Sequence, residues 1–293
     1  MKTAYLINTH KNFDQLARLV AKLQMDRVDF FVHIDKKVPD DIYLPLSETL
    51  KQYGVTLIPD RVCVEWGEFS QVQATLNGLT AIVNSGNKYD YIHFISGQDY
   101  PIKDNLSIRQ YLCDNKGSEF LHYKELSPQG WSEAMARFER YWLYPLGSNR
   151  LRSLMERLLN LLPVRRIPKG YLPYGGSQWW TISSCCATYV LDFVRKNKGF
   201  VRFFRFTHCP DEMFFQTIII NSPFRGKVYN DNLRLIDWSE GKANPKTLTK
   251  RDFDMIKSSP KLFARKFDST IDSDILDSID TYTHSSFQQH PAQ

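Results

Sequence analysis

Cysteine is scarce in the sequence, and the spacing of the few that occur excludes two classes of site. Cys63, Cys113, Cys185, Cys186 and Cys209 are odd in number and contain no Cys-x-x-Cys pair. This pattern fits neither a disulfide framework nor a zinc site. We therefore expect all five thiols to stay reduced, as they would in a reducing compartment.

Long apolar runs are missing as well. No stretch approaches the roughly 20 apolar residues that a membrane-spanning helix needs. The chain runs from Met1 into TAYLINTH without the charged and apolar parts of a secretion signal. These absences predict a cytoplasmic protein whose only membrane contact is peripheral, on the inner face of the cell membrane.

The sequence also lacks a nucleic-acid-binding signature. Its formal charge is +6, but Lys and Arg are scattered, with no basic arm, zinc-finger spacing or RNA-binding motif. This charge should attract anions such as nucleotide diphosphates, acidic glycans or anionic lipid. We expect no nucleic-acid partner; single-strand binding by the aromatic and arginine-rich segment 131–166 is the least favoured alternative.

The sequence does contain an alternation of short apolar strands and amphipathic helices. Strands are expected at 4–8, 28–34, 55–58 and 91–95, and helices at 13–24 and 71–83. In the helices, apolar residues recur every three or four positions. This alternation predicts an α/β fold with a mainly parallel central sheet flanked by helices.

The turn after the strand at 91–95 is the first candidate site. It reads Ser96-Gly97-Gln98-Asp99, and Pro101 fixes the exit of the chain. Ligands of open α/β sheets bind at the carboxyl ends of the strands, so Asp99 is placed where a ligand would lie. The alternative is a tight turn that needs only its glycine.

Two further segments each allow two interpretations. The amphipathic stretch 150–162 predicts a helix that either packs on the sheet, which we favour, or lies on an anionic membrane surface where a lipid-linked acceptor would be found. Asp211 and Glu212 follow Pro210 at the expected start of a helix over 213–220, where acids face unpaired amide groups. Such acids are helix caps unless they also take part in chemistry.

Six blocks of sequence together resemble glycosyltransferase family 14. This family contains the core-2/I-branching β-1,6-N-acetylglucosaminyltransferases and the peptide O-xylosyltransferases. The blocks are HIDKK at 33–37, WGEFSQVQATL at 66–76, ISGQDYPIK at 95–103, GSQWW at 176–180, PDEMFFQTIIINS at 210–222 and LFARKFD at 262–268. The resemblance implies a GT-A-type (Rossmann-like) fold and inverting transfer from a UDP-sugar without a metal ion.

The resemblance also implies catalytic roles. Glu212 matches the base that takes the proton of the acceptor hydroxyl, which leaves Asp211 as a cap. Arg265 and Lys266 match basic residues on the diphosphate, where they would replace the metal that most GT-A enzymes hold with an Asp-x-Asp; here that place reads Ser-Gly-Gln-Asp. We therefore expect no metal and no cofactor. Without this resemblance, an Arg-Lys pair would be interpreted as two solvent-exposed basic residues with no role in binding.

The remaining implied contacts divide into a donor side and an acceptor side. The donor residues, for the uridine and the sugar, are Thr9, His10, Asp35, Trp66, Ser96 and Asp99. The acceptor residues are Arg137, Arg140, Gln178 and Trp179. Some xylosyltransferases have Asp-Trp where this chain has Gln178-Trp179, and the missing acid favours a sugar acceptor over a peptide serine.

The organisation expected from these features is a single domain over 1–280. Residues 1–115 form the nucleotide-sugar-binding half, 116–280 the acceptor and catalytic half, and 281–293 a disordered polar tail. Without the anchor and disulfides of the animal enzymes, the chain resembles a bacterial member that builds surface polysaccharide, with N-acetylglucosamine as the expected sugar. The alternatives are transfer of xylose or another hexose, and an inactive module that only binds nucleotide-sugar or glycan.

Overall fold

The computed structural model describes residues 1–143 and 149–289 of the chain. Within them, a seven-stranded sheet has the order β3-β2-β1-β4-β7-β6-β8. β1, β2, β3 and β4 are parallel, and β7 runs antiparallel to both of its neighbours. The predicted α/β class with a mainly parallel sheet is confirmed. The strands are β1 Thr3–Thr9, β2 Val28–Ile34, β3 Val55–Leu57, β4 Tyr91–Ser96, β6 Glu119–Glu125, β7 Tyr174–Ser183 and β8 Val228–Tyr229.

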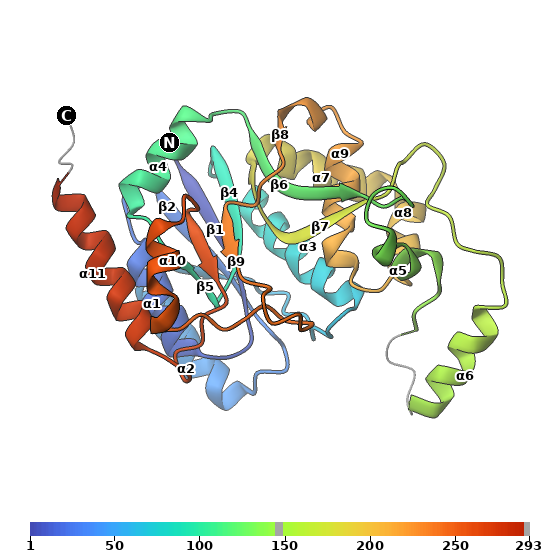
Figure 1. Cartoon of the computed structure of the whole chain (residues 1–293), viewed down its shortest axis with the longest axis horizontal. Coiled ribbons are helices and arrows are strands. Elements are labelled where there is room, and N and C mark those ends of the chain that lie inside the picture. Colours follow the sequence, from blue (N-terminus) through green and yellow to red (C-terminus); the bar gives the residue numbers. More distant parts are fainter. Residues whose placement is uncertain (144–148, 290–293) are drawn as a thin grey trace.

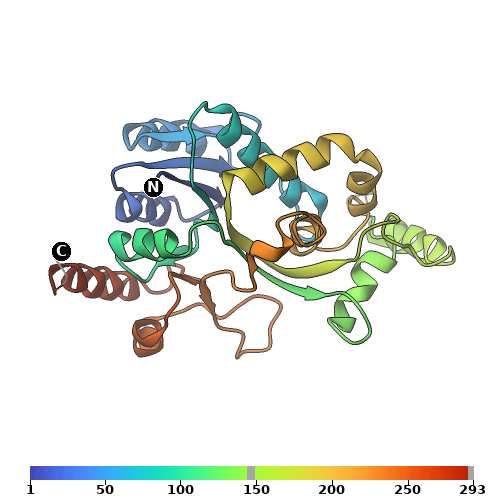
Figure 2. The same cartoon turned by 90° about the horizontal axis from the view of Figure 1, so that it is seen from above.

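Helices cover both faces of this sheet (Figures 1 and 2). Along β1, Tyr5 and Ile7 face the core packed by α1 and α4, whereas Ala4 and Leu6 face the core packed by α3 and α7. A side chain at Gly78 of α3 would meet Leu6 at 2.3 Å, so the glycine lets this helix lie close against β1. The first helices are α1 Phe13–Leu23, α2 Asp40–Gln52, α3 Phe69–Asn84, α4 Asn105–Asp114 and α5 Met135–Glu139.

A small second sheet, in the order β5-β10-β9, packs beside the first. β5 begins directly after the turn that follows β4, and it pairs with β10 so that Arg265 lies opposite Asp99. This pairing brings a C-terminal basic residue next to a loop that lies far from it in the sequence. The strands are β5 Asp99–Pro101, β9 Arg234–Ile236 and β10 Phe263–Arg265, and the later helices are α6 Asn149–Leu159, α7 Ser184–Lys196, α8 Lys198–Phe204, α9 Phe214–Ile220, α10 Phe253–Ser258 and α11 Asp274–Gln289.

The structure corrects two expectations about helices. α6 does not pack on the sheet but projects from the body (Figure 1), and Leu154 and Leu158 are exposed. α11 continues beyond 280, where a disordered tail was expected. Its buried stripe explains the helix, because Thr283 is 2% exposed and receives a 2.6 Å hydrogen bond from Lys22. Residues 290–293 of the expected tail lie outside the described residues.

Candidate active site

A cavity of about 930 Å³ opens at the carboxyl edge of the parallel strands. Its volume lies within the range of about 300 to 1,000 Å³ that is typical of small-molecule sites. Segments that follow β1, β2 and β4 line it, and β7 contributes its first residues because it runs the other way. The predicted site residues that line the cavity are Thr9, His10, Asp35, Trp66, Ser96, Arg137, Gln178, Trp179, Glu212 and Arg265.

Three predicted residues are not among those that line the cavity: Asp99, Arg140 and Lys266. The side chain of Asp99 is fully buried beneath the turn. Arg140 is exposed, and the structure uses its carbonyl oxygen, which accepts a 2.9 Å hydrogen bond from Arg165. Lys266 is partly buried; burial and the charges of Lys11 and Arg265 lower the pKa of its amine.

The turn after β4 is held by its own carboxylate. One oxygen of Asp99 accepts hydrogen bonds from the backbone amide and the hydroxyl of Ser96, at 2.7 and 2.6 Å. A side chain at Gly97 would meet the hydroxyl oxygen of Thr9 at 2.7 Å. The alternative interpretation of this motif, a tight turn that needs glycine, therefore describes Asp99 and Gly97 better than direct ligand contact does.

Asp99 also lies between two arginines on the floor of the cavity. Its carboxylate is 3.3 Å from Arg265 and 3.9 Å from Arg234, and Arg234 is fully buried. Burial lowers the pKa of Arg234 to about 10 and also lowers that of Arg265, but both guanidinium groups remain charged at neutral pH. Two cations against one carboxylate leave the floor with a net positive charge, which favours an anionic ligand above it.

We expect Asp99→Asn to lower the free energy of unfolding by about 3 kcal/mol, because it removes the only carboxylate that the described residues place between two buried cations. Urea denaturation of the variant and of Asp254→Asn, a change at an exposed position, measures the difference. Equal stability of the two variants would show that Asp99 is not the counterion of the arginines.

Arg265 has a second restraint. Its guanidinium carbon lies 4.4 Å from the ring centroid of Trp179, a distance typical of a cation–π contact. Trp179 belongs to β7 and is largely buried. Arg265 is therefore fixed between the turn after β4 and the middle of β7, where it lines the cavity.

The end of the cavity where donor contacts are predicted is built by the loops after β1 and β2. Asp35 accepts hydrogen bonds from the backbone amides of Lys37 and Val64, at 2.8 and 3.4 Å. Burial and the charge of Lys11 lower the pKa of His10, so this imidazole is neutral at neutral pH. Trp66 is 64% exposed at the rim, where an aromatic face is available for stacking.

Glu212 and Arg137 form an ion pair in the lining of the cavity. Arg137 belongs to α5 and donates a 2.6 Å hydrogen bond to the carboxylate of Glu212, and about a third of each side chain is exposed. Burial raises the pKa of Glu212, and Arg137 opposes this effect. The sequence left the direction of this shift open. A carboxylate that is more basic than usual is suited to accept a proton.

Asp211 is not the helix cap that the sequence suggested. Pro210–Glu212 form a short 3₁₀ turn without a side-chain cap, and α9 begins only at Phe214. Asp211 lines the cavity and is 5% exposed, and its Oδ1 has no hydrogen-bond partner among the described residues. Burial and the adjacent charge of Glu212 raise its pKa, so the neutral acid is favoured.

Replacement of Arg137 tests the electrostatic part of this pair. Arg137→Met removes the cation that lowers the pKa of Glu212, so this pKa should rise further. Because Glu212 can act as a base only when deprotonated, the acidic limb of the kcat/KM profile should move to higher pH. If the pH profile is the same as that of the parent protein, Arg137 does not influence the pKa of the base.

Sequence reasoning missed several residues that line the cavity. Arg234 belongs to no motif, and nothing in its local sequence shows that its side chain lies beside Asp99. Trp131 lies below the guanidinium of Arg137, with 5.1 Å between the guanidinium carbon and the ring centroid. A third set comes from connections whose residues carry no motif: Asn230, Asp231, Asn232, Trp238, Lys242 and Lys261.

Within the part of the chain that the structure describes, His, Cys, Asp and Glu form no group of three or more that could hold a metal ion. The two Asp-x-Asp sequences, at 252–254 and 272–274, contribute no residue to the cavity. Independence from metal stays a prediction about the reaction.

Comparison with known proteins decides the family. The sequence model of the Core-2/I-Branching enzyme family matches residues 3–259, which is most of the chain. The chain belongs to the Core-2/I-Branching enzyme family. The prediction of an enzyme of the glycosyltransferase class is thus confirmed at the level of the family.

The relatives of this Core-2/I-Branching chain include mammalian xylosyltransferases. Xylosyltransferase 2 of Mus musculus and that of Homo sapiens are each 25% identical over 307 residues, and Xylosyltransferase 1 of Canis lupus familiaris is 25% identical over 310 residues. Each alignment covers 98% of this chain but only 31–34% of the relative. The chain therefore spans about a third of the length of these relatives, and its expected bacterial origin stays a prediction.

Among solved structures, mouse Xyloside xylosyltransferase 1 in its apo form aligns with 90% of this Core-2/I-Branching chain and 96% of its own, at 11% identity and a TM-score of 0.40. No helix of residues 1–143 and 149–289 combines the length and apolar character needed to cross a bilayer.

Proposed function

We propose that this chain is an inverting, metal-independent glycosyltransferase of GT-A type. It would transfer a sugar, in first place N-acetylglucosamine, from a UDP-sugar to a hydroxyl of a glycan or lipid-linked glycan in surface polysaccharide or glycoconjugate synthesis. The observation that carries the proposal is that a basic floor and a glutamate line one cavity: Arg265 comes from β10 of the small sheet, and Glu212 from the 3₁₀ turn before α9.

In the proposed reaction, the acceptor oxygen forms a bond to the anomeric carbon while the bond from that carbon to the diphosphate oxygen breaks. Glu212 takes the proton of the acceptor hydroxyl as the attack proceeds. Arg137 orients the carboxylate and opposes the rise of its pKa, while burial keeps it more basic than an exposed glutamate. Attack from the side opposite the leaving group inverts the configuration of the sugar.

The leaving UDP carries developing negative charge. Arg265 and Arg234 supply the positive charge that would neutralise it, because Asp99 balances only one of them. Such fixed charges stabilise a transition state without reorganising during the reaction. Lys266, with Lys11 beside it, contributes a weaker long-range field from outside the lining.

Transfer of xylose is the second candidate, since the mammalian relatives reported above are xylosyltransferases by name. Against it, Gln178 lines the cavity where some xylosyltransferases have an acid. An amide at this position accepts and donates hydrogen bonds but cannot act as a base. The inactive binding module is the third candidate, and it differs from the first two only in turnover.

A panel of UDP-sugars tests the proposal. A ligand that binds the folded state raises the melting temperature according to its affinity, so the best donor should give the largest shift. The preferred donor is then incubated with glycan acceptors, and the product is analysed by mass spectrometry and by the configuration at the new linkage. Stabilisation by UDP with no transfer or hydrolysis of any donor would favour the inactive module.

A further inference from the structure

The segment 149–164, which we call the α6 arm, stands away from the body of the molecule. It consists of α6 and the turns that continue it to residue 162 (Figures 1 and 2). Several apolar side chains of the arm face solvent: Leu158 is 57% exposed, Leu161 82% and Val164 62%. Contiguous exposed apolar residues of this kind usually mark a surface that binds a partner.

The exposed leucines of the arm form one stripe. Leu154, Leu158 and Leu161 are spaced by four and three residues, so they are neighbours on the same helical face. Arg150 and Arg157 are four residues before and three residues after Leu154, which places them along the same stripe. Both arginines are exposed. Leucines bordered by basic residues are the pattern of a helix that lies in the interface of a bilayer.

The base of the arm is firmly fixed to the body. The side chain of Arg165 is buried and donates hydrogen bonds to the carbonyl oxygens of Arg140, Phe206 and Phe203. Its guanidinium carbon also lies 4.9 Å from the ring centroid of Tyr141 and 4.2 Å from that of Phe203. The direction in which the arm leaves the body is therefore set by the fold.

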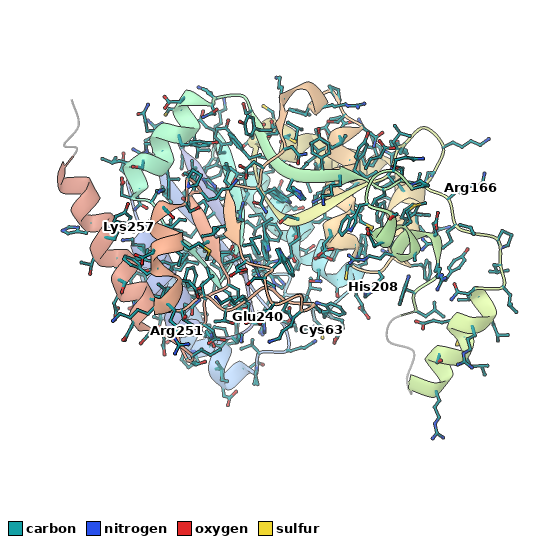
Figure 3. The ribbon with its side chains drawn as sticks, viewed as in Figure 1. Cys63, Arg166, His208, Glu240, Arg251 and Lys257 are labelled. Carbon is teal, nitrogen blue, oxygen red and sulfur yellow. The ribbon has the colours of Figure 1, made fainter. Side chains whose placement is uncertain are left out.

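This base lies next to the rim of the cavity. Trp142 stacks on His208, with 4.6 Å between the ring centroids, and the other neighbour of His208 is Trp66 at the cavity rim. The backbone amide of His208 donates a 3.0 Å hydrogen bond to the carbonyl of Arg137. Figure 3 shows His208 on the side of the body from which the arm leaves. A surface bound by the arm would thus lie close to the opening of the cavity.

We propose that the α6 arm binds the surface of an anionic lipid bilayer. The charge of the segment selects this partner, because residues 149–170 contain Glu156 as their only acid. Beyond the buried Arg165, the exposed basic residues of the segment include Arg150, Arg157, Arg166 and Lys169, and Arg166 lies at the outer edge of the molecule in Figure 3. Each basic residue close to an anionic leaflet strengthens binding, whereas two copies of this arm would repel each other.

The proposal is tested by sedimentation of the full chain with phosphatidylcholine vesicles, with and without phosphatidylglycerol, in the absence of any donor sugar. The chain should bind the vesicles that contain phosphatidylglycerol, and added salt should weaken this binding. The affinity of the double variant Leu154→Ser/Leu158→Ser for these vesicles should be lower by about tenfold or more. Arg150→Glu/Arg157→Glu should reduce binding to the anionic vesicles.

The matched control is Leu44→Ser on α2, since Leu44 is 59% exposed, like Leu158. It should bind vesicles as the parent chain does. Both leucine variants should keep the affinity for UDP, so a failure of membrane binding is distinguishable from a failure of the proposed reaction. Three results would overturn the proposal. They are a parent chain that does not bind anionic vesicles, a double leucine variant that binds them as well as the parent chain does, and an arm that forms dimers in place of binding lipid.

Discussion

Glu212→Gln is expected to lower kcat by about 10²-fold or more, with little change in the affinity for UDP. Glutamine keeps the size of the side chain and can still contact Arg137, but it cannot accept the proton of the acceptor hydroxyl. The loss should therefore fall on the chemical step. Steady-state transfer kinetics and isothermal calorimetry with UDP separate the two quantities.

The control for this variant is Glu133→Gln. Glu133 is exposed in the short 3₁₀ turn Ser132–Ala134 immediately before α5, so it tests a loss of negative charge from the same segment. It should transfer sugar at the parent rate. A Glu212→Gln protein that retains more than about a tenth of the parent kcat would remove Glu212 from the role of general base.

Arg265→Ala is expected to weaken UDP binding by about 30-fold or more and to lower kcat as well. Truncating one partner of a buried charge contact is costly, and here the lost contact would be with the diphosphate. The rate falls in addition because the charge on the leaving group is larger in the transition state than in the bound donor. Arg265→Lys should recover only part of both losses, since an ammonium lacks the forked geometry.

Arg251→Ala is the matched control for the arginine. Arg251 is exposed, and it does not line the cavity (Figure 3). Lys266→Ala should have an intermediate effect, below about tenfold, because a point charge outside the lining acts only through its field. Equal losses in the Arg265 and Lys266 variants would contradict the separate roles given to them.

The sequence predicted the central sheet well because its strands carry strong local signals. Each of the first strands is a short apolar run, and the helices between them have a clear three-to-four residue period. α11 was not predicted, and residues 281–293 were expected to be disordered, because this part of the sequence is polar. The helix depends on tertiary contacts that local sequence does not show. Thr283 accepts a hydrogen bond from Lys22, and the ring of Tyr282 lies 6.2 Å from that of Phe253.

The prediction that α6 packs on the sheet was also wrong, for a related reason. An amphipathic pattern predicts that one face of a helix is covered, but it does not identify what covers it. The favoured interpretation assigned that role to the sheet. In the structure, the short connection through Arg165 carries the helix away from the sheet instead.

The candidate site was predicted where a motif adjoined a strand end. Thr9, Asp35 and Ser96 follow parallel strands, whose carboxyl ends meet at one edge, so they had to converge. Arg234 could not be predicted, since its approach to Asp99 depends on the pairing of β9 with β10. Arg140 was assigned to the acceptor side, with Arg137, because of the family resemblance. Because α5 ends at Glu139, between the two arginines, Arg140 does not share the helix that carries Arg137.

Donor turnover in the presence of excess EDTA tests the account most directly. If Arg265 and Arg234 neutralise the leaving diphosphate, the parent chain should transfer sugar at the same rate in EDTA as in Mg²⁺ or Mn²⁺. Loss of turnover in EDTA that is restored by either ion would contradict the account, because a bound cation would then perform the role assigned here to the two arginines.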